Sequence, residues 1–250
     1  MKRGQATLFV IAGILIAAVA TLSMVYKEQI SQQLIKSGFI KKEALDIEAD
    51  KIEQQIVNCL GTITGNAVLH VAENGGYLLK TSDNFAYYAK NDKLIAPAAS
   101  QLEESISLYV NQMMPTCVVG ESFNAMVEPG GFAKTRTELS DDKINVHVQY
   151  PIEISYEGSS VLKKDFSSEN NMRIGRIYNI AVSIADQHKD KSGVCLSCLE
   201  RTSAENNLKI DVYKPTQSED TFFVITDKTA TINSKPLVYI FAMKLEGTAK

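Results

Sequence analysis

Residues 1–26 read MKRGQATLFVIAGILIAAVATLSMVY, and this stretch decides how the rest of the chain is interpreted. The run from Ala6 to Tyr26 carries no charge and is mainly apolar, and no other stretch of the sequence is comparably long and uncharged. A helix of this length spans about 30 Å, the thickness of the hydrocarbon core of a bilayer. Lys2 and Arg3 on its short side favour the cytoplasm for that end. We therefore expect a membrane-spanning helix, with everything from Lys27 onward outside the cell.

Within this run, two features point to different fates of the helix. Gly13, Ala17 and Thr21 repeat every four positions, a spacing that lets helices approach closely in lipid and favours a retained helix. The triplet from Ala18 to Ala20 fits the rule for cleavage of a secretory signal. Because the apolar run continues past that triplet to Val25, we favour the retained helix.

The first residues also resemble the leader of archaeal type IV pilin-like proteins. Lys2, Arg3, Gly4 and Gln5 stand directly before the apolar run, and in that family a prepilin peptidase cuts between a basic, glycine-ending leader and the helix. The resemblance implies a cut between Gly4 and Gln5, and filament assembly through a helix that contains Phe9, Gly13, Ala17 and Thr21. The helices of the family usually carry a glutamate at the fifth position after the cut, which here is Phe9.

The chain beyond residue 26 is mildly acidic. Without Lys2 and Arg3, 24 of the 26 basic residues remain against 29 acidic ones, a formal charge of −5. Basic residues form only isolated pairs such as Lys41 with Lys42, so nucleic acid is not an expected partner. A part of this size is large enough for one or two compact cores.

Four cysteines in an exported chain indicate disulfides. Cys59 and Cys117 are far apart in the sequence, whereas Cys195 and Cys198 form a C-x-x-C. The economical pairing joins Cys59 to Cys117 and Cys195 to Cys198, although four cysteines allow three connectivities. The C-x-x-C could instead be a redox pair, if a helix N-terminus stabilised one thiolate, or half of a zinc site. With no second C-x-x-C and no preceding βαβ unit, we favour a structural disulfide.

The pattern of apolar residues predicts an α+β fold in three regions. Residues 1–26 would be the leader and a transmembrane or filament-core helix, residues 27–128 a helical stalk with a helix-rich subdomain, and residues 129–250 a globular head of antiparallel strands plus helix. Helical spacing predicts helices over 27–72, 98–114 and 172–190. Alternation of apolar and polar residues predicts an antiparallel meander over 133–166 and three further strands, near 208–213, 222–226 and 237–243.

No residues form a recognisable catalytic constellation in the sequence. His70, His147 and His188 lie far apart, without the spacing of metal ligands. Glu103 and Glu104 are adjacent acids on a predicted helix, with nothing specific in favour of catalysis. No nucleophile elbow and no phosphate-binding glycine loop is present. We therefore expect no enzyme activity, no cofactor and no metal.

These observations predict a structural role at the cell surface. The leading hypothesis is a pilin-like subunit of an extracellular archaeal filament, which forms homo-oligomers through its apolar N-terminal helix. The alternative is a permanently membrane-anchored ectodomain, an adhesin or interaction module that does not polymerise, and Phe9 in place of glutamate favours it. The partner of its head would be the surface of a host or neighbouring cell. A thiol-disulfide oxidoreductase that uses Cys195 and Cys198 is the third possibility.

Overall fold

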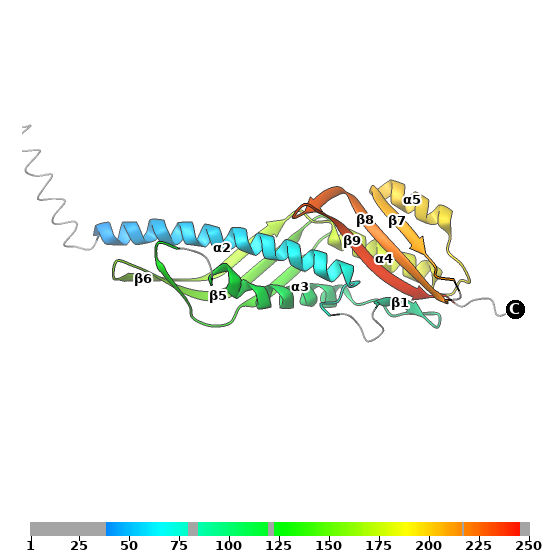
Figure 1. Ribbon diagram of the computed structural model, residues 1–250, viewed down its shortest axis with the longest axis horizontal. Helices are drawn as coiled ribbons and strands as arrows, with labels where there is room; N and C mark the ends of the chain where they lie inside the picture. Colours follow the sequence, from blue (N-terminus) through cyan, green and yellow to red (C-terminus); the bar gives the residue numbers. More distant parts are fainter. Residues whose placement is uncertain (1–38, 80–84, 120–122, 217, 246–250) are drawn as a thin grey trace, which may run out of the picture.

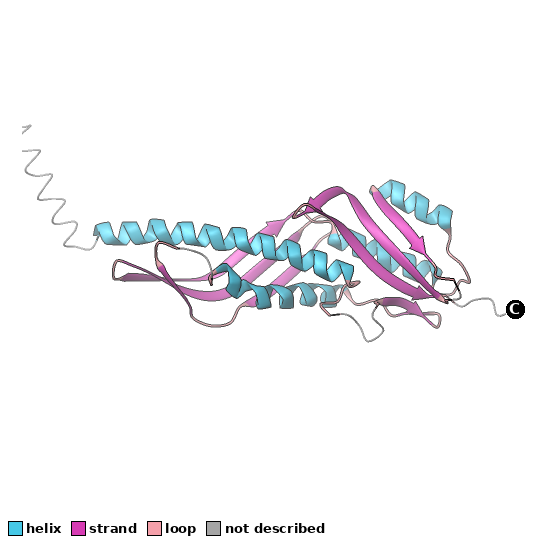
Figure 2. Ribbon diagram, viewed as in Figure 1, coloured by secondary structure: helices cyan, strands magenta, loops and turns pink. Residues whose placement is uncertain are grey.

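The computed structural model describes residues 39–79, 85–119, 123–216 and 218–245. These residues form an elongated α+β molecule in which one long helix lies beside two sheets (Figure 1). The helices gather along one side of each sheet, and the strands of the two sheets lie toward opposite ends of the molecule (Figure 2).

The long helix is α2, Phe39–Glu73. Its buried residues recur every three or four positions, so one stripe of the helix faces the core: Leu45, Ala49, Ile52, Ile56, Leu60, Ile63 and Ala67. The helix ends at two glycines with positive φ, Gly75 (63°) and Gly76 (94°), and the N–H of Gly76 donates to the carbonyl of Val71 at 2.9 Å. A Cβ on Gly75 would lie 2.4 Å from the Cβ of Ala86, so this turn requires glycine.

The first sheet is mixed and has five strands in the order β2-β1-β9-β8-β7. β1 pairs in parallel with β9, and all other neighbours are antiparallel. The strands are β1 Tyr87–Lys90, β2 Lys93–Leu94, β7 Leu208–Tyr213, β8 Asp220–Ile232 and β9 Lys235–Lys244. β7 therefore forms one edge of the sheet.

The second sheet is antiparallel and is organised around β5, Ile144–Tyr156. β6, Ser159–Asn170, pairs with β5 along its length, while β3, Met126–Pro129, and β4, Lys134–Leu139, pair with successive parts of β5. Alternate residues of β5 are buried, from Ile144 onward, as the alternation in the sequence predicts. The predicted meander is confirmed.

Three shorter helices and one 3-10 turn complete the fold. They are α3 Ala99–Met113, the 3-10 helix η1 Met114–Cys117, α4 Ile174–His188 and α5 Leu196–Asn206. The helices predicted over 98–114 and 172–190 are confirmed, whereas α5 is not predicted by the sequence analysis.

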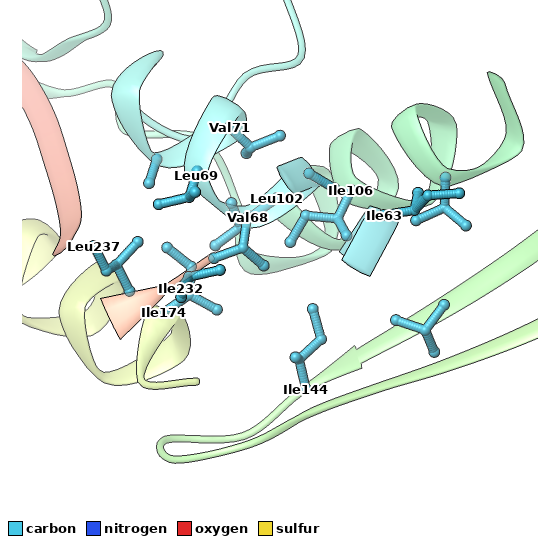
Figure 3. Close-up of a cluster of buried hydrophobic side chains, with 14 of the residues drawn as sticks. Ile63, Val68, Leu69, Val71, Leu102, Ile106, Ile144, Ile174, Ile232 and Leu237 are labelled. Carbon is cyan, nitrogen blue, oxygen red and sulfur yellow. The ribbon is translucent and has the colours of Figure 1, made fainter. Parts of the chain in front are cut away.

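A single core joins the two sheets. In Figure 3, Val68 and Leu69 of α2 lie near Ile174 of α4 and near Ile232 and Leu237 of the β8–β9 hairpin. Further along α2, Ile63 lies beside α3, and the buried face of β5 begins close by (Figure 3). The boundary expected between residues 128 and 129 falls inside β3, which pairs with β5.

The predicted architecture, which centres on a long apolar N-terminal helix, is wrong. Of the helices in the described residues, none is long and apolar enough to cross a membrane. The longest, α2, carries charged side chains such as Glu43, Asp50 and Lys51 on its exposed side, because only one stripe of it packs against the sheets. The head also contains a mixed sheet, because β1 joins it in parallel with β9. The run expected as the apolar helix, 6–26, lies outside the described residues.

Candidate functional site

The C-x-x-C begins helix α5, and its two cysteines form a disulfide. Cys195 is the N-cap residue, with extended backbone, and its Sγ accepts a hydrogen bond from the N–H of Cys198 at 3.3 Å. The hydroxyl of Ser197 lies 3.6 Å from the same sulfur atom. Both cysteines are half-buried. Two donors therefore point at the Sγ of Cys195 at the positive end of a helix.

A buried histidine fixes the backbone at this point. His188 is the last residue of α4 and is 1% exposed. Its Nδ1 lies 2.8 Å from the carbonyl oxygen of Ile184, and because a carbonyl only accepts, Nδ1 carries the proton. Its Nε2 is then free to accept the N–H of Cys195, at 3.1 Å. His188 thus joins the end of α4 to the start of α5.

A cavity of about 250 Å³ opens between α5 and the edge strand β7. Leu196, Leu199, Glu200 and Ser203 line it from one face of α5, and residues 210–212 line it from β7. Leu196 stands between the two cysteines in the sequence and is 63% exposed. The disulfide and the cavity therefore share the first turn of the same helix.

An ion pair and hydrogen bonds hold α5 on the sheet. The guanidinium of Arg173 lies 3.1 Å from the carboxylate of Asp227 on β8, whose side chain is 2% exposed, and its other terminal nitrogen donates to the carbonyl of Asn206 at the end of α5. The hydroxyl of Ser203 donates to the carbonyl of Leu208 at 2.7 Å. These contacts hold the C-terminal half of α5 on the sheet, while His188 holds its N-terminal end.

The second disulfide joins the middle of α2 to η1, the 3-10 helix that directly follows α3. Cys59 and Cys117 are bonded across 58 residues of sequence, with their Cα atoms 5.7 Å apart. Cys117 lies in η1 and is 1% exposed. With Cys195 and Cys198 also bonded, the pairing is the one that the spacing makes most economical.

Other predicted site residues lie outside the described residues. These are the expected cleavage pair and the residues of the expected assembly helix: Gly4, Gln5, Phe9, Gly13, Ala17 and Thr21.

The remaining histidines and Glu103, one of the two adjacent acids, have structural partners. The Nε2 of His70 lies 2.9 Å from the carbonyl oxygen of Leu78, and the Nδ1 of His147 lies 2.8 Å from the hydroxyl of Ser167. The carboxylate of Glu103 accepts the N–H of Leu139 at 3.0 Å, which ties α3 to β4. Within the ranges that the structure describes, no three ligand side chains are grouped so as to hold a metal ion.

Two buried tyrosines form a polar contact inside the core. The hydroxyls of Tyr88 on β1 and Tyr239 on β9 are hydrogen-bonded to each other, and Tyr88 also donates to the carbonyl of Gly75 at 3.2 Å. Burial raises the pKa of both hydroxyls well above the usual value for tyrosine. This contact joins the turn after α2 to the sheet.

Sequence reasoning missed α5 and the contact between His188 and Cys195. A signal for the helix was present, because Leu196, Leu199 and Ser203 recur at helical spacing and are followed by Asn207, a residue type that can end a helix. In the structure Asn207 adopts the left-handed conformation of such an end. The histidine could not be assigned to the site from sequence, because its contact depends on how the end of α4 meets α5.

Comparison of the chain with protein-family models, with curated proteins and with solved structures finds no match. The candidate site therefore rests on the geometry of this chain.

Proposed function

We propose that the protein is a structural component of an extracellular surface assembly, a pilin-like subunit that presents the two-sheet head. The observation that carries the proposal is the position of α2, which contacts both sheets and α3 and is joined covalently at its middle to the end of the α3 region. A tensile load that enters at the first residues of α2 would therefore reach the rest of the molecule through packing and through a disulfide.

Polar contacts reinforce the part of α2 that precedes the disulfide. The ammonium of Lys163 on β6 lies 2.6 Å from the carboxylate of Glu53 and 3.2 Å from that of Asp50. The Lys163 side chain is 28% exposed, so these ion pairs are partly shielded from solvent. The β5–β6 hairpin runs beneath this part of α2 (Figure 1), and the two elements support one another.

Residues 2–5 resemble a pilin-like leader, and this resemblance supplies the assembly route. In this proposal, copies of the chain assemble through residues that precede α2, and the two-sheet head forms the outer surface. The two disulfides fit an extracellular location, where disulfides persist.

A second candidate is a surface adhesin or interaction module that does not polymerise. Phe9 favours it, because it stands where pilin-like helices usually have a glutamate. Both candidates place the head outside the cell, and they differ only in whether copies of the chain assemble.

Electron microscopy of sheared surface material from native cells tests the proposal. Fibres whose main constituent, identified by peptide mass, is this chain would support the subunit role. If the chain stays with the cells after shearing and no fibre contains it, the filament proposal fails and the adhesin is favoured. Fibres treated with a reductant should also break at lower shear than untreated fibres, because the Cys59–Cys117 bridge is lost.

A further inference from the structure

We propose that the Cys195–Cys198 disulfide is a thiol-disulfide exchange site, which oxidises a pair of thiols in an extended polypeptide segment whose aliphatic side chain occupies the cavity between α5 and β7. This activity goes beyond the proposed structural role and does not depend on whether the protein polymerises.

The two disulfides differ in accessibility. Cys195 and Cys198 are both half-buried at the start of α5. In the long bridge only Cys59 is half-buried, whereas Cys117 is 1% exposed and lies in the core. An incoming thiolate must approach along the axis of the S–S bond, so access decides which bridge reacts. Attack on Cys59 would release a thiolate on Cys117 inside the core, where burial disfavours the charge, so the short bridge is the one expected to react with a thiol of another polypeptide.

The contacts of Cys195 make its sulfur the leaving group. The N–H of Cys198 already points at this sulfur at 3.3 Å, and the hydroxyl of Ser197 lies 3.6 Å from it. A negative charge on that atom would be stabilised by both donors and by the N-terminus of an 11-residue helix. His188 holds the backbone of Cys195 in place, so the donors need no rearrangement when the charge forms.

The reaction balances without another reagent. A substrate thiolate attacks the Sγ of Cys198, the S–S bond breaks, and Cys195 leaves as a thiolate that then takes a proton. The second substrate thiol loses its proton and attacks the substrate sulfur of the mixed disulfide, and Cys198 leaves and is protonated. The substrate loses two electrons and two protons and gains a disulfide, while Cys195 and Cys198 become two thiols.

The cavity selects the segment beside the reacting cysteines. Leu196, Leu199 and Val212 give it aliphatic walls, and Glu200 and Asp211 place two carboxylates on its lining. A side chain such as leucine would bury its apolar surface against the aliphatic walls, whereas an acidic side chain would meet like charge. β7 is an edge strand that pairs only with β8 among the described strands, so an extended segment can add to its free edge through backbone hydrogen bonds. The substrate is thus an extended segment with an aliphatic residue close to its cysteines.

A synthetic dithiol peptide with a leucine beside one cysteine is the probe, and the same peptide with aspartate in that position is its control. Each is mixed with the full-length oxidised protein, and free thiols are alkylated and located by peptide mass. We expect peptide disulfide to form in step with thiols at Cys195 and Cys198, at least tenfold faster than thiols at Cys59 and Cys117. The leucine peptide should react at least fivefold faster than the aspartate peptide.

Two variants separate recognition from simple exposure. Leu196→Ser should abolish the preference for the leucine peptide. Leu162→Ser is the matched control, because Leu162 is 61% exposed on β6, in the other sheet, and should leave the preference unchanged. In Cys195→Ser, the oxidised leucine peptide should be captured as a mixed disulfide on Cys198.

Reduction of both bridges at the same rate would overturn the proposal, because it would show no reactive site at α5. Equal rates for the two peptides, or equal effects of the two leucine variants, would overturn the assignment of the cavity. Both results leave the electron microscopy of fibres unaffected, so failure here is distinct from failure of the structural role.

Discussion

Removal of the Cys59–Cys117 bridge should cost the protein much more stability than removal of the Cys195–Cys198 bridge. The first closes a loop of 58 residues and the second a loop of 3. In the chain-entropy model, the long loop contributes about 4 kcal/mol to the free energy of unfolding and the short loop about 2. Cys117 is also buried, and the loss of its sulfur leaves a small cavity that costs about 1 kcal/mol more.

Urea unfolding of two double variants measures these values. We expect a loss of about 5 kcal/mol for Cys59→Ala with Cys117→Ala, and about 2 kcal/mol for Cys195→Ala with Cys198→Ala, from the same loop estimate and small-cavity cost. The slope of the free energy against urea should rise in the first variant only, because its unfolded chain is freed from a long constraint and exposes more surface.

The slope distinguishes the two possible origins of the effect. An unchanged slope with a large loss of stability would place the effect in the folded packing around Cys117 rather than in the unfolded chain. A loss no larger than that of the short bridge would refute the argument from loop length, and with it the view that this disulfide ties α2 to the α3 region.

Three further predictions concern the contacts that hold the elements together. Arg173→Met should lower the free energy of unfolding by about 3 kcal/mol, because it leaves the carboxylate of Asp227 buried without its cation; urea unfolding measures the loss. Stability should fall as the pH rises above about 10, by up to about 1.4 kcal/mol per pH unit for each buried tyrosine, because the raised pKa keeps Tyr88 and Tyr239 protonated in the folded state after the unfolded chain has lost those protons; thermal unfolding across alkaline pH measures this slope. Gly75→Ala should cost more than about 2 kcal/mol or prevent folding, since φ is 63° and the new Cβ would lie 2.4 Å from that of Ala86; expression and urea unfolding measure it.

Each of these has a matched control. Arg136→Met removes a cation whose side chain is 80% exposed and should change stability by less than about 1 kcal/mol; an equal loss would contradict the argument from burial. Tyr239→Phe should make the alkaline slope shallower, and an unchanged slope would assign it to other groups. Gly158→Ala also has a positive φ, 82°, but its Cβ would meet nothing within 4 Å, so it should cost only about 1 kcal/mol. Similar losses at the two glycines would show that close packing at Gly75 is not the cause.

Periodicity predicted the described helices and strands where one face of the element is buried. The alternation after Ile144 follows the pleat of β5, and the spacing from Ile174 follows the buried side of α4. Such patterns are local, so they can be recognised in a single sequence. α5 has only one fully buried residue, Leu199, and with so short a buried stripe its periodicity is weak.

The mixed sheet could not be predicted in the same way. β1 and β9 are more than 140 residues apart, and their parallel pairing brings Tyr88 to the hydroxyl of Tyr239. Neither strand carries a local signal of its partner, and the two meet in a sheet that α4 contacts at both strands. The candidate site could not be predicted from the sequence either, because His188 and Cys195 come into contact only in the folded arrangement of α4 and α5.

The unequal contributions of the two bridges make a structural role compatible with thiol exchange. The long bridge lies partly in the core and supplies most of the disulfide stabilisation, so it can remain closed while the short one reacts. Opening the short bridge removes only a small loop constraint, and α5 keeps its other contacts, from Arg173 to Asn206 and from Ser203 to Leu208. The reduced protein should therefore stay folded, with Cys195 held beside the same donors, and be ready for reoxidation by a disulfide of another molecule.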